Sequence, residues 1–194
     1  IGALATANST LEELYLLQKL MRGIGSQNID FRLRQSDFSP DGKQQGAPWL
    51  GMSVSDISRA DRFLIVGSFL RKDHPLLAAR IRQAVKKGAQ ANIIHSADDD
   101  LLMKVTNKSI IAPDAIVDML TQISKALAAV KQGMQAASGE AAGIARSLAS
   151  GERIAVLLGN FAQQHPQAAQ LQALAQQIAA LGSGKFGFFG EAAN

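Results

Sequence analysis

The chain has 194 residues, of which 47% are hydrophobic, and it carries a formal net charge of +4 and no cysteine. A chain of this length can bury roughly 70% of its unfolded surface, enough for one sizeable core or two small ones. Without cysteine, these residues cannot form disulfides, thiolate zinc sites, iron–sulfur ligation or a cysteine nucleophile.

The first part of the chain predicts a strand, a helix and then a loop. Residues 1–6 are mostly apolar, and Thr10 with Glu13 forms a capping box, which predicts a helix that begins near Leu11 and packs on a sheet. Residues 28–49 are rich in Asp, Gly and Pro, so we expect an irregular loop over 35–49. A short helical turn is expected at 55–60.

The most informative stretch runs from Arg59 to Gln90. Residues 63–66 are Phe-Leu-Ile-Val, without polar alternation, as is typical of a strand covered on both faces. A turn at Gly67 follows, and Pro75 suits the first turn of a helix that Gly88 is placed to end. This pattern predicts one complete βα unit.

The rest of the chain continues the alternation. We expect strands at 91–95, 154–158 and 185–189, a helix opened by Pro113, two helices over 126–150 with a break near Gly139, and a helix from Pro166 to near Gly182. Residues 98–111 have no clear pattern. The predicted fold class is therefore α/β, a Rossmann-like, mostly parallel sheet with helices on both faces.

Two stretches of the sequence echo one another. Residues 63–69 and 155–161 each read as an apolar strand, a glycine, a polar residue and a phenylalanine, and each leads to a His-Pro pair and a helix. We expect two equivalent βα units whose loops share one edge of the sheet. In doubly wound folds, ligands bind at that edge.

Two glycine motifs resemble nucleotide-binding sequences but are interpreted as chance matches. Gly182, Gly184 and Gly187 spell GxGxxG, but a dinucleotide fingerprint follows a strand and opens a helix, whereas this run follows a predicted helix and opens a strand. The same residues do not complete a phosphate loop, because Phe186 stands where Ser or Thr would hold magnesium.

The residues that could ligate a metal or act as acids and bases favour structural roles. His74 and His165 precede prolines in matching loops, and no other ligands are spaced to form a zinc site with them or with His95. Residues 98–100, three consecutive aspartates, indicate a solvated acidic loop rather than a cation site. No nucleophile motif or catalytic carboxylate pair is present, so neither a catalytic nor a metal residue is predicted.

Positive charge is concentrated in residues 59–90, which hold eight Lys and Arg. A nucleic-acid-binding module is one hypothesis for this stretch, and it predicts salt-dependent DNA binding. However, Phe63 and Phe69 are its only aromatic residues, too few for a stacking platform. A solvated helix face or an interface with another domain is favoured, and no nucleic acid is expected as a partner.

Several stretches together resemble one family. The stretches are Asn8–Leu20 with Asn28–Arg34, Ala60–Ser68 with Asp73–Pro75 and Arg80–Arg82, and Leu157–Gly159 with Gln164–Pro166 through Glu191–Asn194. They resemble the large iron–sulfur subunit of bacterial NADH-quinone oxidoreductase, respiratory complex I. That subunit is similar in turn to the molybdopterin oxidoreductases.

The resemblance implies a single α/β domain over 1–194 that is a fragment of a longer subunit, as the absence of a methionine or basic leader at Ile1 also suggests. It implies a non-catalytic, structural role in electron transfer from NADH to quinone, with iron–sulfur clusters in an N-terminal part of the parent and no cofactor in this fragment. Implied partners are other domains of the parent and other peripheral-arm subunits. The implied location is the cytoplasmic face of the bacterial membrane, without insertion, and the polar residues of the uncharged run 154–184 agree.

The resemblance also implies positions for a ligand. In similar molybdenum enzymes such loops approach a pterin nucleotide, which places vestigial cofactor-binding residues at Gly67, Ser68, Phe69, His74, Gly159 and Asn160. The metal-ligand position falls near Ser36, and the complex I subunit is understood to have lost the metal. The alternative is a molybdopterin-type oxidoreductase domain that retains its pterin-nucleotide site.

Overall fold

The computed structural model describes residues 1–6, 8–31, 37–40, 48–134 and 138–190. These residues belong to two compact units, the first within 1–36 and the second within 37–190. The single domain expected over 1–194 stays a prediction. Residues 35, 36 and 41–47 of the expected irregular loop, Ser36 among them, lie outside the described residues.

The first unit contains a two-stranded parallel sheet and one helix. Strands β1 (Ala3–Leu4) and β2 (Ile29–Asp30) pair in register, Ala3 with Ile29, and α1 (Leu11–Gly23) lies between them in sequence. Thr10 and Glu13 form the predicted capping box at its start. The strand and helix are confirmed, but the strand pairs with β2 in a separate small sheet rather than joining the large one.

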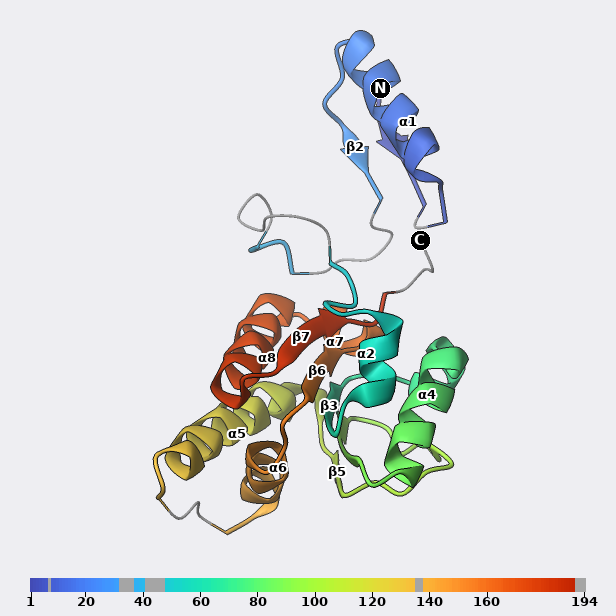
Figure 1. Cartoon of the computed structure of the whole chain (residues 1–194). Helices are drawn as coiled ribbons and strands as arrows, with labels where there is room; N and C mark the ends of the chain where they lie inside the picture. Colours follow the sequence, from blue (N-terminus) through green and yellow to red (C-terminus); the bar gives the residue numbers. More distant parts are fainter. Residues whose placement is uncertain (7, 32–36, 41–47, 135–137, 191–194) are drawn as a thin grey trace. The chain divides into compact units, whose positions relative to one another are not determined.

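The second unit is a five-stranded parallel sheet with helices on both faces (Figure 1). Its strands are β3 (Arg62–Val66), β4 (Gln90–His95), β5 (Asn107–Ile110), β6 (Ile154–Leu158) and β7 (Lys185–Phe188). The strands are ordered β5-β4-β3-β6-β7. The predicted α/β class, with a parallel sheet between helix layers, is confirmed.

The helices divide between the two faces of this sheet. On one face lie α2 (Val54–Arg59) and α4 (Pro75–Lys86), and on the other lie α5 (Ile116–Lys131), α6 (Glu140–Ala149) and α8 (Ala168–Gly182) (Figure 1). Three short helical turns, α3 (Leu70–Asp73), η1 (Pro113–Ala115) and α7 (Asn160–Gln163), complete the unit. In the part of the chain that the structure describes, no helix is both long and apolar enough to cross a bilayer.

Side chains alternate between two cores because successive strand residues point to opposite faces. Phe63 and Ile65 of β3 belong to the core under α2 and α4, while Leu64 and Val66 belong to the core under α5, α6 and α8. All four side chains are buried. This arrangement explains why the strand shows no polar alternation in its sequence.

Most predicted boundaries agree with the structure to within two residues. Strand β2 lies in a stretch where a loop was expected, and the first of the two helices expected over 126–150 is the end of α5, which continues to Lys131. Strand β5 was not predicted, because its Asn-Lys-Ser-Ile sequence is polar and it lies at the edge of the sheet. Helix α8 begins at Ala168 rather than Pro166, because His165 and Pro166 belong to the turn after α7.

The structure confirms that the GxGxxG run follows a helix and leads into a strand, which is the reverse of a dinucleotide fingerprint. Gly182 is the last residue of α8, and Gly187 lies inside β7. A Cβ on Gly187 would lie 1.8 Å from the carbonyl oxygen of Leu50, and the Phe188 N–H donates to the Trp49 carbonyl at 2.8 Å. This glycine therefore lets the segment before α2 approach the edge strand.

Candidate functional site

The strand order creates a switch point between β3 and β6. After β3 the chain continues through α4 to β4 on one side, and after β6 it continues through α8 to β7 on the other side. The two strands pair in parallel, Val66 opposite Leu158, so their carboxyl ends lie side by side. The expectation that both loops share one edge is confirmed, and this is where doubly wound folds bind ligands.

The two loops contact each other through their glycines. The Gly159 N–H donates to the Val66 carbonyl at 2.8 Å, and the Phe161 N–H donates to the Gly67 carbonyl at 3.0 Å. A Cβ on Gly159 would lie 2.3 Å from the Cβ of Ser68, and one on Gly67 would lie 2.6 Å from the backbone nitrogen of Ala162. Only residues without a side chain permit so close an approach.

One histidine of the matching loops has a structural role. The Nδ1 of His165 accepts from the Gln167 N–H at 3.0 Å, so its Nε2 carries the proton and donates to the Pro113 carbonyl at 3.1 Å. Both ring nitrogens are therefore paired, and the ring connects the turn before α8 to the turn before α5. This is the structural use that was expected of the histidines.

The equivalent histidine, His74, is different. Its ring stacks on Phe189 with 5.1 Å between centroids, and its Nε2 is buried without a hydrogen-bond partner. Desolvation lowers the pKa of His74, against an opposing effect of Asp73. The imidazole is therefore neutral near pH 7.

His95 also belongs to this edge, although it was not predicted to. It ends β4, is 3% exposed, and lies between the rings of Phe69 (4.4 Å) and Phe161 (5.2 Å). Its Nδ1 accepts from the Ala97 N–H at 2.8 Å, so the proton of the neutral ring is on Nε2. Desolvation lowers the pKa of His95, with Asp99 and Asp73 opposing.

Several buried polar atoms near this edge have no hydrogen-bond partner among the described residues. They are the Oγ atoms of Ser68 and Ser96, the Nε2 atoms of His74 and His95, and the Oδ1 of Asn160. Buried polar groups are almost always paired, and an unpaired one costs about 1–3 kcal/mol. The edge therefore has unused capacity to hydrogen-bond a polar ligand or a partner.

The polar side chains of this edge can hydrogen-bond a ligand. Among the described residues, Ser68 Oγ has no hydrogen-bond partner, and Asn160 Nδ2 donates to Asp73 Oδ2 at 3.4 Å. Within the described ranges, no group of three or more His, Asp or Glu side chains is arranged to hold a metal ion.

Most of the predicted site residues come together here. Gly67, Ser68, Phe69, Gly159 and Asn160 lie on the two touching loops. His74 directly follows α3, and its ring stacks on that of Phe189. The residues that were missed are His95, Ser96, Phe161 and Asp73. A signal for His95 was available, because it ends the strand predicted next to 63–66 and must therefore reach the same edge.

The basic residues of 59–90 serve several separate contacts. Arg59 pairs with Asp56 at 2.7 Å, and Arg71 lies 4.0 Å from Asp100. The Nε of Arg62 donates to the Ser147 carbonyl at 2.9 Å, near the end of α6. These contacts engage three of the eight basic residues, and the interpretation of the stretch as a solvated face stays a prediction.

Sequence relatives of this chain are oxidoreductases. The family model described as "Molybdopterin oxidoreductase" matches residues 1–191. The G subunit of NADH-quinone oxidoreductase from Rickettsia felis is 30% identical over 89 residues, which cover 46% of this chain and 13% of that protein. The F420-dependent formate dehydrogenase subunit alpha of Methanocaldococcus jannaschii is 36% identical over 98 residues, covering 48% of this chain and 15% of that protein.

One solved structure with a similar fold is the formyltransferase/hydrolase complex (FhcABCD) from Methylorubrum extorquens, solved in complex with methylofuran. The TM-score is 0.64 at 16% identity, over 97% of this chain and 53% of that chain. At this identity, the likeness concerns the fold alone. The matched segments of the two sequence relatives are 13% and 15% of their lengths, so the chain spans a small part of each.

Proposed function

The chain belongs to the molybdopterin oxidoreductase family, and we propose that within it the chain is a non-catalytic structural domain of the large subunit of an NADH:quinone oxidoreductase. In this role it supports electron transfer from NADH to quinone without taking part in the chemistry. The similarity to the NADH-quinone oxidoreductase subunit of Rickettsia felis supports the choice of complex.

The observation that carries this proposal is the ring cluster at the switch point. The ring of His95 packs on Phe69 and on Phe161 at the carboxyl edge of the sheet, where doubly wound domains bind ligands. We infer that these rings occupy space that a ligand would otherwise take. We therefore expect this edge to stabilise the domain.

The remaining parts of the proposal follow from the same relative. The partners would be other domains of the parent subunit and other subunits of the peripheral arm, on the cytoplasmic side of the membrane. The iron–sulfur clusters would be held elsewhere in the parent, since no residue of this chain is a cysteine.

A second candidate is a domain that retains a pterin-nucleotide site, and the unpaired polar atoms of Ser68, His74 and Asn160 favour it. These residues fit the polar groups of a nucleotide, since a hydroxyl, an amide oxygen and a ring nitrogen are all free to bond. When bound, such a cofactor supplies the redox-active metal. The residues of this chain would hold and orient its nucleotide part.

One titration distinguishes the two candidates. The chain is titrated with guanosine monophosphate, the nucleotide part of such a cofactor, and binding is followed by calorimetry for the wild type, Ser68→Trp, Asn160→Ala and the control Ser55→Trp on the exposed side of α2. A structural domain gives no saturable heat up to about millimolar concentration, a limit of about 4 kcal/mol in binding free energy.

Saturable binding that survives Ser55→Trp and is lost in both Ser68→Trp and Asn160→Ala would overturn the structural proposal and establish the second candidate. A supporting measurement adds NADH and a quinone to the isolated chain, where no turnover is expected. Clear turnover there would also contradict a structural role.

A further inference from the structure

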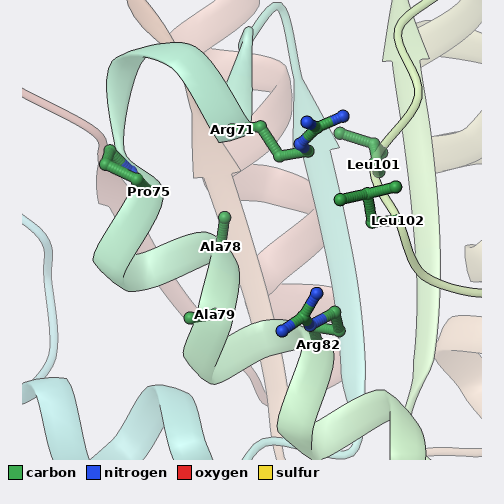
Figure 2. A pocket seen from close by; sticks show the side chains of 7 residues that line it. All are labelled: Arg71, Pro75, Ala78, Ala79, Arg82, Leu101 and Leu102. Atoms are coloured by element: carbon green, nitrogen blue, oxygen red, sulfur yellow. The ribbon is translucent and has the colours of Figure 1, made fainter.

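A cavity separate from the switch-point edge lies between α4 and the loop before β5. Its volume is about 170 Å³, and it is lined by Arg71, Pro75, Ala78, Ala79, Arg82, Leu101 and Leu102. Figure 2 shows the side chains of Arg71 and Arg82 flanking this space, with Leu101 and Leu102 on the loop that faces α4. The cavity thus combines two guanidinium groups with a mostly apolar wall.

Arg82 is the less satisfied of the two arginines. Its Nε is buried and has no hydrogen-bond partner, and among the residues that the structure describes it forms no ion pair. Arg71 donates to the Asp100 carbonyl and lies 4.0 Å from the Asp100 carboxylate, which is 76% exposed. The carboxylate offsets part of the charge of Arg71 but leaves that of Arg82 uncompensated. A partly buried, unpaired cation is costly unless an anion joins it.

The wall opposite α4 is held in an unusual backbone conformation. Leu102 has φ +51°, in the left-handed region that costs a non-glycine residue about 1–3 kcal/mol, and its N–H donates to Asp100 Oδ1 at 2.9 Å. Such conformations are concentrated at ligand clamps. The aspartate therefore fixes the loop that places Leu101 and Leu102 against the cavity.

From these features we propose that the cavity binds a small oxyanion, a phosphate or carboxylate group, with Arg82 as the principal ligand and Arg71 as the second. Guanidinium groups bind both kinds of oxyanion through paired N–H donors. The apolar wall of Pro75, Ala78 and Leu101 accommodates a short hydrocarbon part of the ligand. The inference does not depend on the proposed function, because it uses none of the switch-point residues.

The test is a titration at constant ionic strength with inorganic phosphate in one arm and propionate in the other. NMR follows the Nε–Hε signal of Arg82 and the amide of Leu102 in the 194-residue chain. Saturable shifts at both signals are expected in at least one arm, and the arm with the tighter binding identifies the anion.

Three variants test whether Arg82 binds the anion in this cavity. Arg82→Gln removes the charge and should weaken binding by about tenfold or more, since a charged hydrogen bond contributes about 1.5–3 kcal/mol. Arg80→Gln, an exposed arginine on the same helix, is the matched control and should change affinity by less than about twofold, as expected of an exposed charge. Ala79→Glu keeps Arg82 and puts a carboxylate at the exposed rim of the cavity, so like-charge repulsion should weaken binding by more than Arg80→Gln does.

Because Ala79 is exposed, the Glu variant should fold even if Arg82→Gln does not. Linear shifts of the Leu102 amide that are equal in size in the wild type and all three variants, in both arms, would overturn the proposal. An affinity of Ala79→Glu equal to that of the wild type would do the same.

Discussion

At the scale of single residues, the candidate site is defined by which polar atoms have partners. His165 is paired at both ring nitrogens, whereas His95 uses only Nδ1. The sequence places both histidines directly after apolar strands or turns and cannot distinguish them. The difference arises because the Nε2 of His165 donates to the carbonyl of Pro113, which is distant in sequence, whereas the ring of His95 packs against Phe69 and Phe161.

The lowered pKa of His95 predicts a pH dependence of stability. In the unfolded chain the group titrates near its ordinary value of 6.5, and in the folded chain burial lowers the pKa. The unfolded state therefore binds the proton more readily, so stability is fully present above pH 6.5 and falls as the pH decreases towards the folded pKa. This histidine alone contributes a slope of at most about 1.4 kcal/mol per pH unit.

The measurement compares urea unfolding of the wild type and His95→Asn between about pH 8 and about pH 5. The asparagine Oδ1 can still accept from the Ala97 N–H, so the local turn is kept. The wild type should lose stability relative to the variant as the pH falls below about 6.5. A difference that stays constant over this range would refute the prediction.

At the scale of elements, much of the second unit could be predicted from sequence. Strands β3 and β6 are recognisable because residues 63–66 and 154–158 are apolar without interruption, and Pro75 and Gly182 indicate the start of α4 and the end of α8. The one-turn helices α3 and α7 could not be predicted, because four residues carry no periodic pattern. In the two matching βα units, they separate Gly67 from His74 and Gly159 from His165.

A buried polar network also escaped prediction. Asn92 is fully buried in β4, and its Nδ2 donates to the Phe63 carbonyl at 2.9 Å and to Ser147 Oγ at 3.1 Å, while its Oδ1 accepts from Asn107 Nδ2 at 2.6 Å. In sequence it is one polar residue inside an apolar run. Its partners come from three other elements, so only the assembled sheet reveals them.

The close contact between the loops at Gly67 and Gly159 predicts that one added methyl group lowers stability. Gly159 has φ −86°, which suits any residue, so Gly159→Ala acts only through the collision of its Cβ with Ser68 and the Gly67 carbonyl. We expect it to lower the free energy of unfolding by about 1–3 kcal/mol, as overpacking typically does. Gly23→Ala is the control, because a Cβ there meets nothing within 4 Å and stability should not fall.

Thermal unfolding followed by circular dichroism checks this prediction. An equal melting temperature for Gly159→Ala and the wild type would show that the loops at Gly67 and Gly159 are not in tight contact.

At the scale of the whole molecule, the two cores belong to the second unit. All their buried members lie between residues 52 and 189, on either side of one sheet. The order β5-β4-β3-β6-β7 could not be read from any single stretch of sequence. The matching sequences of residues 63–69 and 155–161 nevertheless predicted correctly that β3 and β6 end at a common edge of the sheet.

This distribution of core residues predicts that a chain beginning at Asp37 folds on its own. Both clusters are kept in it, so the melting temperature should stay within a few degrees of that of the full chain, a change worth about 1 kcal/mol or less. Differential scanning calorimetry of the two chains measures the effect. Loss of a cooperative transition in the shorter chain would contradict the prediction.

The contact between Gly67 and Gly159 has a consequence for association. Because neither of the two loops can move inward, the surface that they form is already in place before a ligand or a partner binds. A molecule or a neighbouring subunit that docks there would not have to order flexible loops, and little conformational entropy would be lost on assembly. Complexes formed through this face should therefore associate without a slow rearrangement step.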